Sequence, residues 1–247
     1  MDIKNIVAGI IVLGLSISAF AVEPDWGDYA RLLQENVTTE QFKGTRLNRV
    51  NYTRLKQDPG FEKVVKQLET CSPEALANNQ ERLAFYINAY NILAMKMVLD
   101  HWPLKSIRDA GNFIAPVWKK EAGQIGGTTL SLDEIENKIL RPMGEPRIHM
   151  AIVCASVSCP DLRQEPYRGK ELDRQLDEQA GSFLSNPEKG LHVDGTEART
   201  SRIFDWFEDD FKPGHESVEK FIRHYTDLPS GLKLKADLPY DWSLNGE

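Results

Sequence analysis

Residues 78–103, NNQERLAFYINAYNILAMKMVLDHWP, constrain the fold more than any other part of the chain. Asn79 is a good helix N-cap, and the run 101–103 (His-Trp-Pro) ends the helical pattern. Apolar residues recur at helical spacing and form a broad stripe: Leu83, Tyr86, Ile87, Tyr90, Ala94 and Met97. A stripe of this width predicts a long helix that is buried inside one domain.

Two asparagines interrupt the apolar character of this helix. Asn88 and Asn91 stand three residues apart and face the same general side. Asparagine is a poor helix former and is costly to bury without partners. The pair therefore either hydrogen-bonds to neighbouring backbone and locks the packing, or lines a polar cleft.

Other segments mix helices with short strand hairpins. Residues 26–69 carry helical apolar spacing in two segments, and 117–130 reads as a hairpin that turns at Gly126-Gly127. Ser131 and Glu134 form a capping box that starts a helix over 132–141. A short strand is expected over 148–154, a helix over 169–184, a hairpin over 190–204 that turns at Asp194-Gly195, and a helix over 217–225. Helices that do not alternate regularly with strands predict a single α+β domain, with helices packed on a small antiparallel or mixed sheet.

The N-terminus has the pattern of a secretory signal peptide. Lys4 precedes an apolar run over 6–15, and Ala19-Phe20-Ala21 forms a small-residue cleavage site. The run is shorter than the roughly 20 residues that a membrane-spanning helix needs. We therefore expect a signal peptide over 1–21 with cleavage after Ala21, and a mature domain over 22–247 that is periplasmic or secreted, with no membrane span.

Charge and motif content restrict the partners. The net charge is −7, and no basic run of five or more residues occurs, which argues against a nucleic-acid partner. The chain has no H-E-x-x-H, no paired C-x-x-C, no glycine-rich phosphate loop and no G-x-S-x-G. We predict no metal site and no cofactor, and the sequence identifies no protein partner.

The stretch RIHMAIVCASVSCPDL, residues 147–162, is the main candidate for chemistry. In a regular strand His149 and Cys154 point to opposite faces, whereas Cys159 follows a turn-forming stretch. One hypothesis makes Cys159 a thiolate nucleophile, His149 or His192 its base, and an acid from 205–210 the group that orients the imidazole. Asp205 is the first choice for that acid, with Asp209 and Asp210 as alternatives.

Two structural interpretations compete with this hypothesis. Cys154 packs as an inert, buried strand residue in one of them, because a free cysteine behaves as a small apolar group. In the other, Cys159 is disulfide-bonded to Cys154 or to Cys71, which removes the nucleophile. The sequence leaves both open.

Four ordered segments resemble the marker segments of the family called domain of unknown function 547. They are AFYINAYNILAMKMVL, SLDEIENKILR, HMAIVCASVSCPDL and TSRIFDWFEDDF. The resemblance extends over about 61–225, and this chain departs from it at Tyr86, where Trp is common, and at Thr200, where Leu is common. It implies a single fold and no particular reaction. By resemblance, the motif positions are Tyr86, Asn88, Asn91, Glu136, Arg141, His149, Cys154, Cys159, Pro160, Phe204, Trp206 and Phe211.

The motif groups suggest a cleft between the helix of 80–100, the strand and loop of 148–160, and the segment 204–211. We expect it to bind a small polar or peptide-like ligand through Tyr86, Asn88, Asn91, Glu136 and Arg141. The alternative is a cysteine-dependent hydrolase or acyltransferase acting on amide or peptide-like bonds, with Cys159 and His149 catalytic and an asparagine as oxyanion donor. A third interpretation is a purely structural buried hydrogen-bond network.

Overall fold

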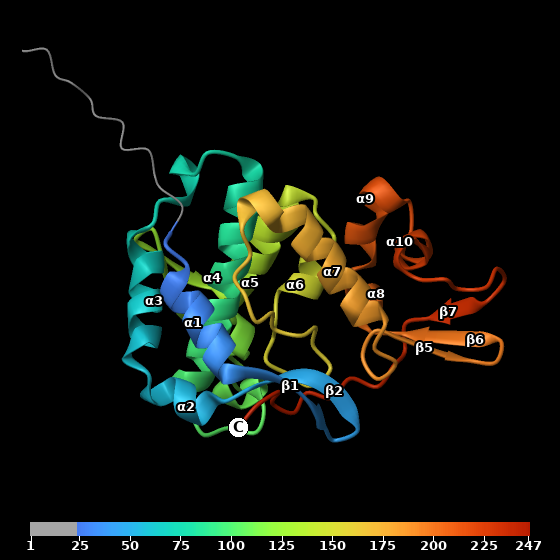
Figure 1. Ribbon diagram of the computed structural model, residues 1–247, viewed down its shortest axis with the longest axis horizontal. Helices are drawn as coiled ribbons and strands as arrows, with labels where there is room; N and C mark the ends of the chain where they lie inside the picture. The colour runs from blue at the N-terminus through green and yellow to red at the C-terminus, as the bar shows by residue number, and fades with distance from the viewer. Residues whose placement is uncertain (1–23) are drawn as a thin grey trace, which may run out of the picture.

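The protein, seen in a computed structural model that describes residues 24–247, is an α+β structure with three small separate sheets (Figure 1). The predicted fold class is confirmed, except that the strands form two-stranded and three-stranded sheets and not one. The expected signal peptide over 1–21 lies outside the described residues. Within 24–247, no helix is both long and apolar enough to cross a bilayer.

The N-terminal part combines helices with a hairpin that the sequence pattern did not reveal. Its elements are α1 (Gly27–Asn36), β1 (Val37–Phe42), β2 (Thr45–Val50), α2 (Tyr52–Gln57) and α3 (Pro59–Thr70). β1 is exposed over most of its length, so it lacks the apolar alternation that identifies a half-buried strand. The turn between the strands has positive φ at Lys43 (49°) and Gly44 (86°), and a Lys-Gly pair is a weaker turn signal than Asn-Gly.

The predicted long helix is α4 (Asn79–Asp100), and it forms the centre of the larger core. Nearly every side chain from Leu83 to Leu99 is buried, which agrees with the expected broad stripe. The N-cap is Asn78 and not Asn79: the Asn78 side chain accepts the N–H of Glu81 at 2.9 Å. In Figure 1, α4 runs between the α1 and α3 helices and α7 (Leu172–Leu184).

Residues 121–140 form the elements that their turn glycines and capping residues predict. β3 (Glu121–Ile125) and β4 (Thr128–Ser131) form the expected hairpin, and both turn glycines have positive φ. Ser131 and Glu134 form the predicted capping box at the start of α5 (Leu132–Glu134). The helix then continues as a π-helical turn over Ile135–Leu140, a distortion frequent at functional sites.

A second, smaller core holds the C-terminal part together. The predicted hairpin is β5 (Leu191–Asp194) with β6 (Glu197–Thr200), and β7 (Lys233–Lys235) adds to β6 in parallel. The helical turn α8 (Ile203–Trp206) and the predicted helix α10 (Val218–Tyr225) lie near this sheet, and the helical turn α9 (Lys212–His215) lies next to α10 (Figure 1). Phe204, Phe211 and Phe221 pack on one another in this core.

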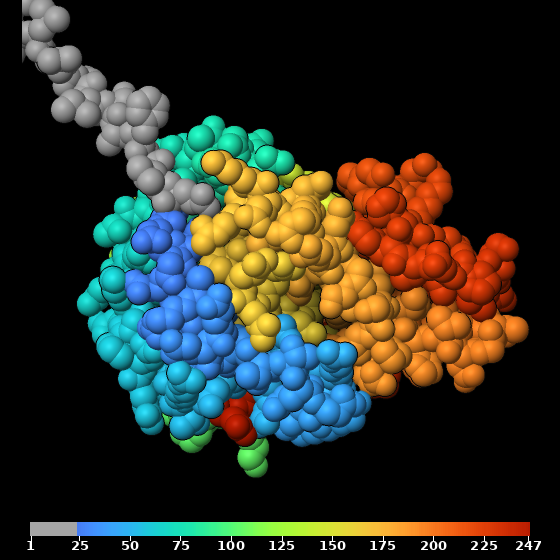
Figure 2. Space-filling model, in the orientation of Figure 1, coloured from blue at the N-terminus to red at the C-terminus, as the bar shows by residue number. Residues whose placement is uncertain are grey.

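The C-terminal tail returns to the N-terminal half of the molecule. Gly246 pairs with Val50 of β2, and Leu244 pairs with Ser156 in the loop after α6 (Ile148–Ala151). In Figure 2 the red terminal residues are visible between the blue and cyan surfaces of the N-terminal part. The tail therefore fixes 240–243 beside the loop of 154–159.

Candidate functional site

A pocket of about 230 Å³ lies where α4, the π-helical turn, the 152–160 loop, α8 and the C-terminal tail meet. Six aromatic side chains line it, and four of its polar groups are chemically versatile: Glu136, His149, Cys154 and Cys159. The aromatic lining consists of Tyr90, Trp118, Trp206, Phe207, Tyr240 and Trp242. A largely apolar pocket with a few convergent polar groups is typical of a small-molecule site.

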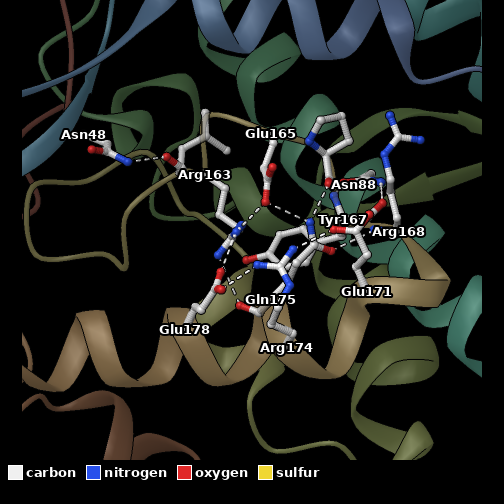
Figure 3. A network of polar contacts seen from close by, with 12 residues as sticks. Asn48, Asn88, Arg163, Glu165, Tyr167, Arg168, Glu171, Arg174, Gln175 and Glu178 are labelled. Carbon is white, nitrogen blue, oxygen red and sulfur yellow. Dashed lines mark hydrogen bonds and ion pairs between the residues drawn. The ribbon is translucent and has the colours of Figure 1, made fainter.

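A larger depression of about 810 Å³ lies elsewhere, between the β1–β2 hairpin and α7. Its central arginine is paired: Arg163 donates to Glu165 at 2.6 Å and to Glu178 at 3.0 Å (Figure 3). Asn48 likewise donates to the Leu162 carbonyl at 2.8 Å. Arg163 and Asn48 are thus already partnered, and none of the residues that line this depression is a histidine or a cysteine, so we place the candidate site in the smaller pocket.

The expected strand over 148–154 is wrong in its first half, because residues Ile148–Ala151 form the short helix α6. All four of its side chains are buried, so apolar periodicity could not separate a strand from a helix here. Pro146 precedes the helix, and its carbonyl accepts the His149 N–H at 3.2 Å. His149, Cys154 and Cys159 consequently line one pocket, which the alternation of a regular strand would have prevented.

The side-chain amides of the two asparagines in α4 hydrogen-bond to backbone groups of other segments, as the backbone of an adjacent strand would. Asn91 donates to the Ala151 carbonyl at 3.0 Å and accepts the Val153 N–H at 2.8 Å. Asn88 makes the same pair of bonds with Tyr167, at 2.8 and 2.9 Å (Figure 3). Both side chains are buried, and neither lines the pocket. The geometry therefore corresponds to the packing interpretation and gives no support to a ligand contact or an oxyanion donor.

Asp210, not the expected Asp205, is the acid that contacts His149. The Nε2 atom of His149 lies 2.8 Å from Asp210 Oδ2, whereas Asp205 is exposed on α8. The ring of His149 stacks on Phe207, with centroids 4.1 Å apart. Burial lowers the pKa of His149 to about 4, against the opposing effect of Asp210, so the imidazole is neutral at pH 7. Since a carboxylate can only accept, Nε2 carries the proton.

Arg141 anchors this acid. Its guanidinium donates to both oxygens of Asp210, at 2.6 and 2.9 Å, and to Asn137 at 2.7 Å. Such a bidentate pair fixes the carboxylate in position. The Arg141 interactions thus orient Asp210 and, through it, His149, and Arg141 does not line the pocket.

Of the two cysteines in the pocket, Cys154 has the environment of the more acidic thiol. Cys159 is buried, its sulfur accepts the Cys154 N–H at 2.8 Å, and burial next to Cys154 holds its pKa well above the usual range. Cys154 is half-buried and lies 3.1 Å from Ser156 Oγ and 3.4 Å from Tyr240 Oη. Burial alone would raise the pKa of Cys154, but hydrogen bonds from Cys159, Ser156 and Tyr240 outweigh it and lower the pKa to about 7.

All three cysteines are free thiols in this structure. Cys71 lies near Tyr86, and neither residue lines the pocket. Ala155, directly after Cys154, has φ of 57°, in the left-handed region that non-glycine residues rarely adopt. Strained backbone of this kind is common at functional sites.

Glu136 faces Cys154 from the π-helical turn. The Tyr90 hydroxyl donates to its carboxylate at 3.5 Å. Burial, and next the negative charge of Cys154, raise the pKa of Glu136 to about 7, although Arg141 opposes this. A carboxyl and a thiol that both titrate near neutrality therefore share one pocket, which is the pattern of an acid–base site.

The pocket contains residues that the sequence reasoning did not single out. Tyr240 and Trp242 come from the C-terminal tail, and Trp118 comes from the turn before β3. The one available signal was the concentration of aromatic residues in PYDW near the chain end. In residues 24–247, no three His, Cys, Asp or Glu side chains converge as a metal site requires.

A comparison with models of protein families found one family that matches part of this chain. Residues 73–184 match the model described as "Protein of unknown function, DUF547". The chain carries a DUF547 domain. The match includes Glu136, His149, Cys154 and Cys159, whereas Asp210 and the aromatic residues of the tail lie outside it. Searches of curated proteins and of solved structures found no match.

Proposed function

We propose that this pocket is the active site of a thiol-dependent hydrolase or acyltransferase in which Cys154 is the nucleophile. One observation carries the proposal: the hydroxyls of Ser156 and Tyr240 lie 3.1 and 3.4 Å from the Cys154 sulfur, in the wall of a pocket. Burial raises the pKa of Tyr240 well above its usual range, so its hydroxyl keeps its proton and can donate to the thiolate. A thiolate that is stabilised and still half-exposed is a competent nucleophile.

Glu136 is the acid–base group of this proposal. His149 is less suited, because its Nε2–H is engaged by Asp210 and its pKa of about 4 keeps it neutral. The pKa of Glu136, about 7, leaves a large share of both protonation states at neutral pH. Its carboxyl can therefore donate a proton in one half of the reaction and accept one in the other.

The reaction would proceed in two steps. The Cys154 thiolate adds to the carbonyl carbon of an amide or ester, and the carbonyl electron pair moves to oxygen. When the C=O bond re-forms, the bond to the leaving group breaks, Glu136 protonates that group, and a thioester remains on Cys154. In the second step the Glu136 carboxylate takes a proton from water, the resulting hydroxide adds to the thioester carbonyl, and Cys154 leaves as thiolate.

The proposed substrate is small, with a polar carbonyl group and an apolar portion. A pocket of about 230 Å³ admits only a small acyl group, and its aromatic wall suits the flat faces of amide and apolar groups. We further propose that the mature domain is exported, as its N-terminal pattern indicates. The enzyme therefore requires that Cys154 escapes oxidation in that compartment.

Binding without turnover is the second candidate. It is favoured by the contact between the two cysteines, in which the Cys159 sulfur lies 2.8 Å from the Cys154 nitrogen. If the pair is oxidised in the exported protein, the nucleophile is consumed and the same pocket serves only to bind a small polar or peptide-like ligand.

Trapping of the acyl-enzyme tests the proposal. Reduced protein is mixed with p-nitrophenyl acetate, and release of nitrophenol is followed together with peptide mapping of the acetyl group. We expect continued turnover for the wild type and for C159S, none above background for C154S, and a persistent acetyl group on Cys154 in E136Q. Cys71 in the same molecule provides the control for non-specific acylation, since burial raises its pKa to about 11.

The outcomes separate the two candidates. If C154S turns over as fast as the wild type, or if acetylation of Cys154 is no faster than that of Cys71, the enzyme proposal is wrong. If Cys154 is acetylated rapidly but the wild type never releases the acetyl group, the pocket binds and reacts without catalysing hydrolysis.

A further inference from the structure

A second cleft adjoins the mouth of the Cys154 pocket. Trp118 and Trp242 line both the pocket and a larger surface cleft of about 1000 Å³. Their ring centroids lie 6.3 Å apart, so the two hollows share an aromatic boundary. A ligand that fills the pocket can therefore extend past these two rings into the cleft.

The cleft presents cations that have no acidic partner. Within residues 24–247, neither Lys105 nor Arg108 forms a salt bridge, although most other arginines of this part of the chain do. The guanidinium of Arg108 lies over the ring of Trp242, 5.1 Å from its centroid. Stacking on an aromatic face orients the guanidinium and leaves its N–H donors at the rim available.

The two carboxylates of the cleft are engaged by backbone groups. Asp109 accepts the N–H groups of Lys105 and Ser106 at 3.2 and 3.0 Å. Asp241 accepts the Ser243 N–H at 2.8 Å. These bonds hold each carboxylate in place through one oxygen, and within residues 24–247 neither carboxylate forms a salt bridge with Lys105 or Arg108, so both cations can bind an anion from outside.

The outer edge of the cleft is apolar. Phe113 lines it and is fully exposed, in the loop of residues 111–116. Figure 2 shows a green segment, in the colour of this part of the chain, projecting at the lower edge of the molecule beside the red C-terminal residues. The cleft thus combines an apolar edge, an aromatic boundary and a guanidinium, which suits a chain with an apolar body and an anionic end.

We infer that the cleft binds the anionic end of an extended substrate whose reacting carbonyl lies at Cys154, and that Arg108 is the residue that recognises the charge. This inference rests on the proposed function and adds a substrate class to it: acyl compounds with a carboxylate or a similar anion distant from the reacting carbon. Arg108 acts here as a specificity residue and takes no part in bond formation.

Paired maleimides of equal length provide the test. The Cys154 thiolate adds to the maleimide double bond, and the other carbon takes a proton from water, so no further reactant is needed. The probes are 6-maleimidohexanoate and its uncharged amide, applied to reduced full-length protein at low salt. We expect the carboxylate to label Cys154 about two- to five-fold faster than the amide, as a single exposed ion pair allows. The preference should disappear at high salt.

Variants assign the effect to Arg108. The two probes should label R108Q equally fast, and R108K should retain much of the preference for the carboxylate. K170Q is the matched control, because it removes one exposed positive charge that also lacks a salt-bridge partner in the described residues. Equal loss of preference in R108Q and K170Q, or no preference in the wild type, would overturn the inference while Cys154 labelling still supports the nucleophile.

A second measurement does not need the thiol. In C154S, titration with 6-phenylhexanoate should shift the indole NMR signals of Trp118 and Trp242 at lower concentrations than titration with 6-phenylhexanamide does. R108Q should abolish that difference. If the two ligands bind equally well to C154S, the anion site is absent whatever the reactivity of Cys154.

Discussion

The hydroxyl oxygen of Tyr240 lies 3.4 Å from the sulfur of Cys154, although the two residues are 86 positions apart in the chain. The contact exists because the C-terminal tail pairs with the loop that carries Cys154: the Val157 N–H donates to Ser243 at 2.8 Å, and the Asp241 N–H donates to Ser158 at 2.8 Å. One of the hydrogen bonds that lower the pKa of Cys154 thus comes from a segment outside the matched DUF547 residues.

Removal of the Tyr240 hydroxyl should raise the pKa of Cys154. A donor to the thiolate stabilises the charged form, and a single hydrogen bond of this kind contributes on the order of 1 kcal/mol, or somewhat under one pH unit. In Y240F the pH midpoint of Cys154 alkylation by iodoacetamide should therefore move up from about 7 by roughly half to one unit. Y225F is the control, because the Tyr225 hydroxyl contacts Asp177, away from the pocket. An unchanged midpoint in Y240F would contradict the role of this contact.

His149 and Glu136 should make opposite contributions to the pH dependence of stability. The folded pKa of His149 is lowered to about 4, so its contribution is complete above its ordinary pKa of 6.5 and is lost as the pH falls toward 4. The folded pKa of Glu136 is raised from 4.5 to about 7, so its contribution is complete below 4.5 and is lost as the pH rises through 7. Between pH 4.5 and 6.5 the two slopes oppose each other.

Single variants should separate these slopes. Relative to the wild type, H149Q should become less stable with rising pH over this window, since the slope from Glu136 is no longer opposed. E136Q should show the reverse. For each variant, the difference from the wild type should change by up to about 3 kcal/mol across this window. Urea unfolding at several pH values measures both, and other titrating groups cancel in the comparison with the wild type. Parallel curves for all three proteins would contradict the pKa assignments.

Asn91→Leu should destabilise the fold strongly. The leucine is apolar and similar in size, but it leaves the Ala151 carbonyl and the Val153 N–H buried without partners. Each such group costs about 1–3 kcal/mol, so we expect a loss of about 2–5 kcal/mol in the free energy of unfolding. The exposed Asn79 is the control position, where Asn79→Leu should change the free energy by less than about 1 kcal/mol. A small effect at Asn91 would show that the amide serves something other than packing.

The success of the sequence prediction depended on how local each signal was. The β3–β4 hairpin, the Ser131–Glu134 capping box and α10 were predicted correctly, because turn glycines, capping side chains and apolar spacing all act within a few residues. The β1–β2 hairpin was missed because its outer face is polar. The helix α6 was mistaken for a strand because every side chain in it is buried, which leaves no periodicity to read.

The site itself was only partly predictable. The sequence brought His149, Cys154, Cys159 and Glu136 into consideration, and all four line the pocket. The choice between Cys154 and Cys159 depended on contacts with Ser156 and Tyr240. The choice between Asp205 and Asp210 depended on how the turn after α8 presents its side chains to His149. Contacts between side chains that are far apart in the sequence cannot be predicted from the local spacing of residues.

Mild oxidation should inactivate the pocket through Cys159. The Cys159 sulfur lies beside the Cys154 backbone, and a Cys159 hydrogen bond helps to lower the pKa of Cys154, so the two thiols are neighbours. Diamide, which takes up two protons and two electrons, should join them in a disulfide and leave Cys71 reduced. Alkylation of Cys154 should then fall to background and return after treatment with dithiothreitol. In C159A, Cys154 should still be alkylated at diamide concentrations that abolish its alkylation in the wild type. If C159A and the wild type lose reactivity in parallel, another oxidation product of Cys154 is responsible, and the neighbouring thiol gives the pocket no redox sensitivity.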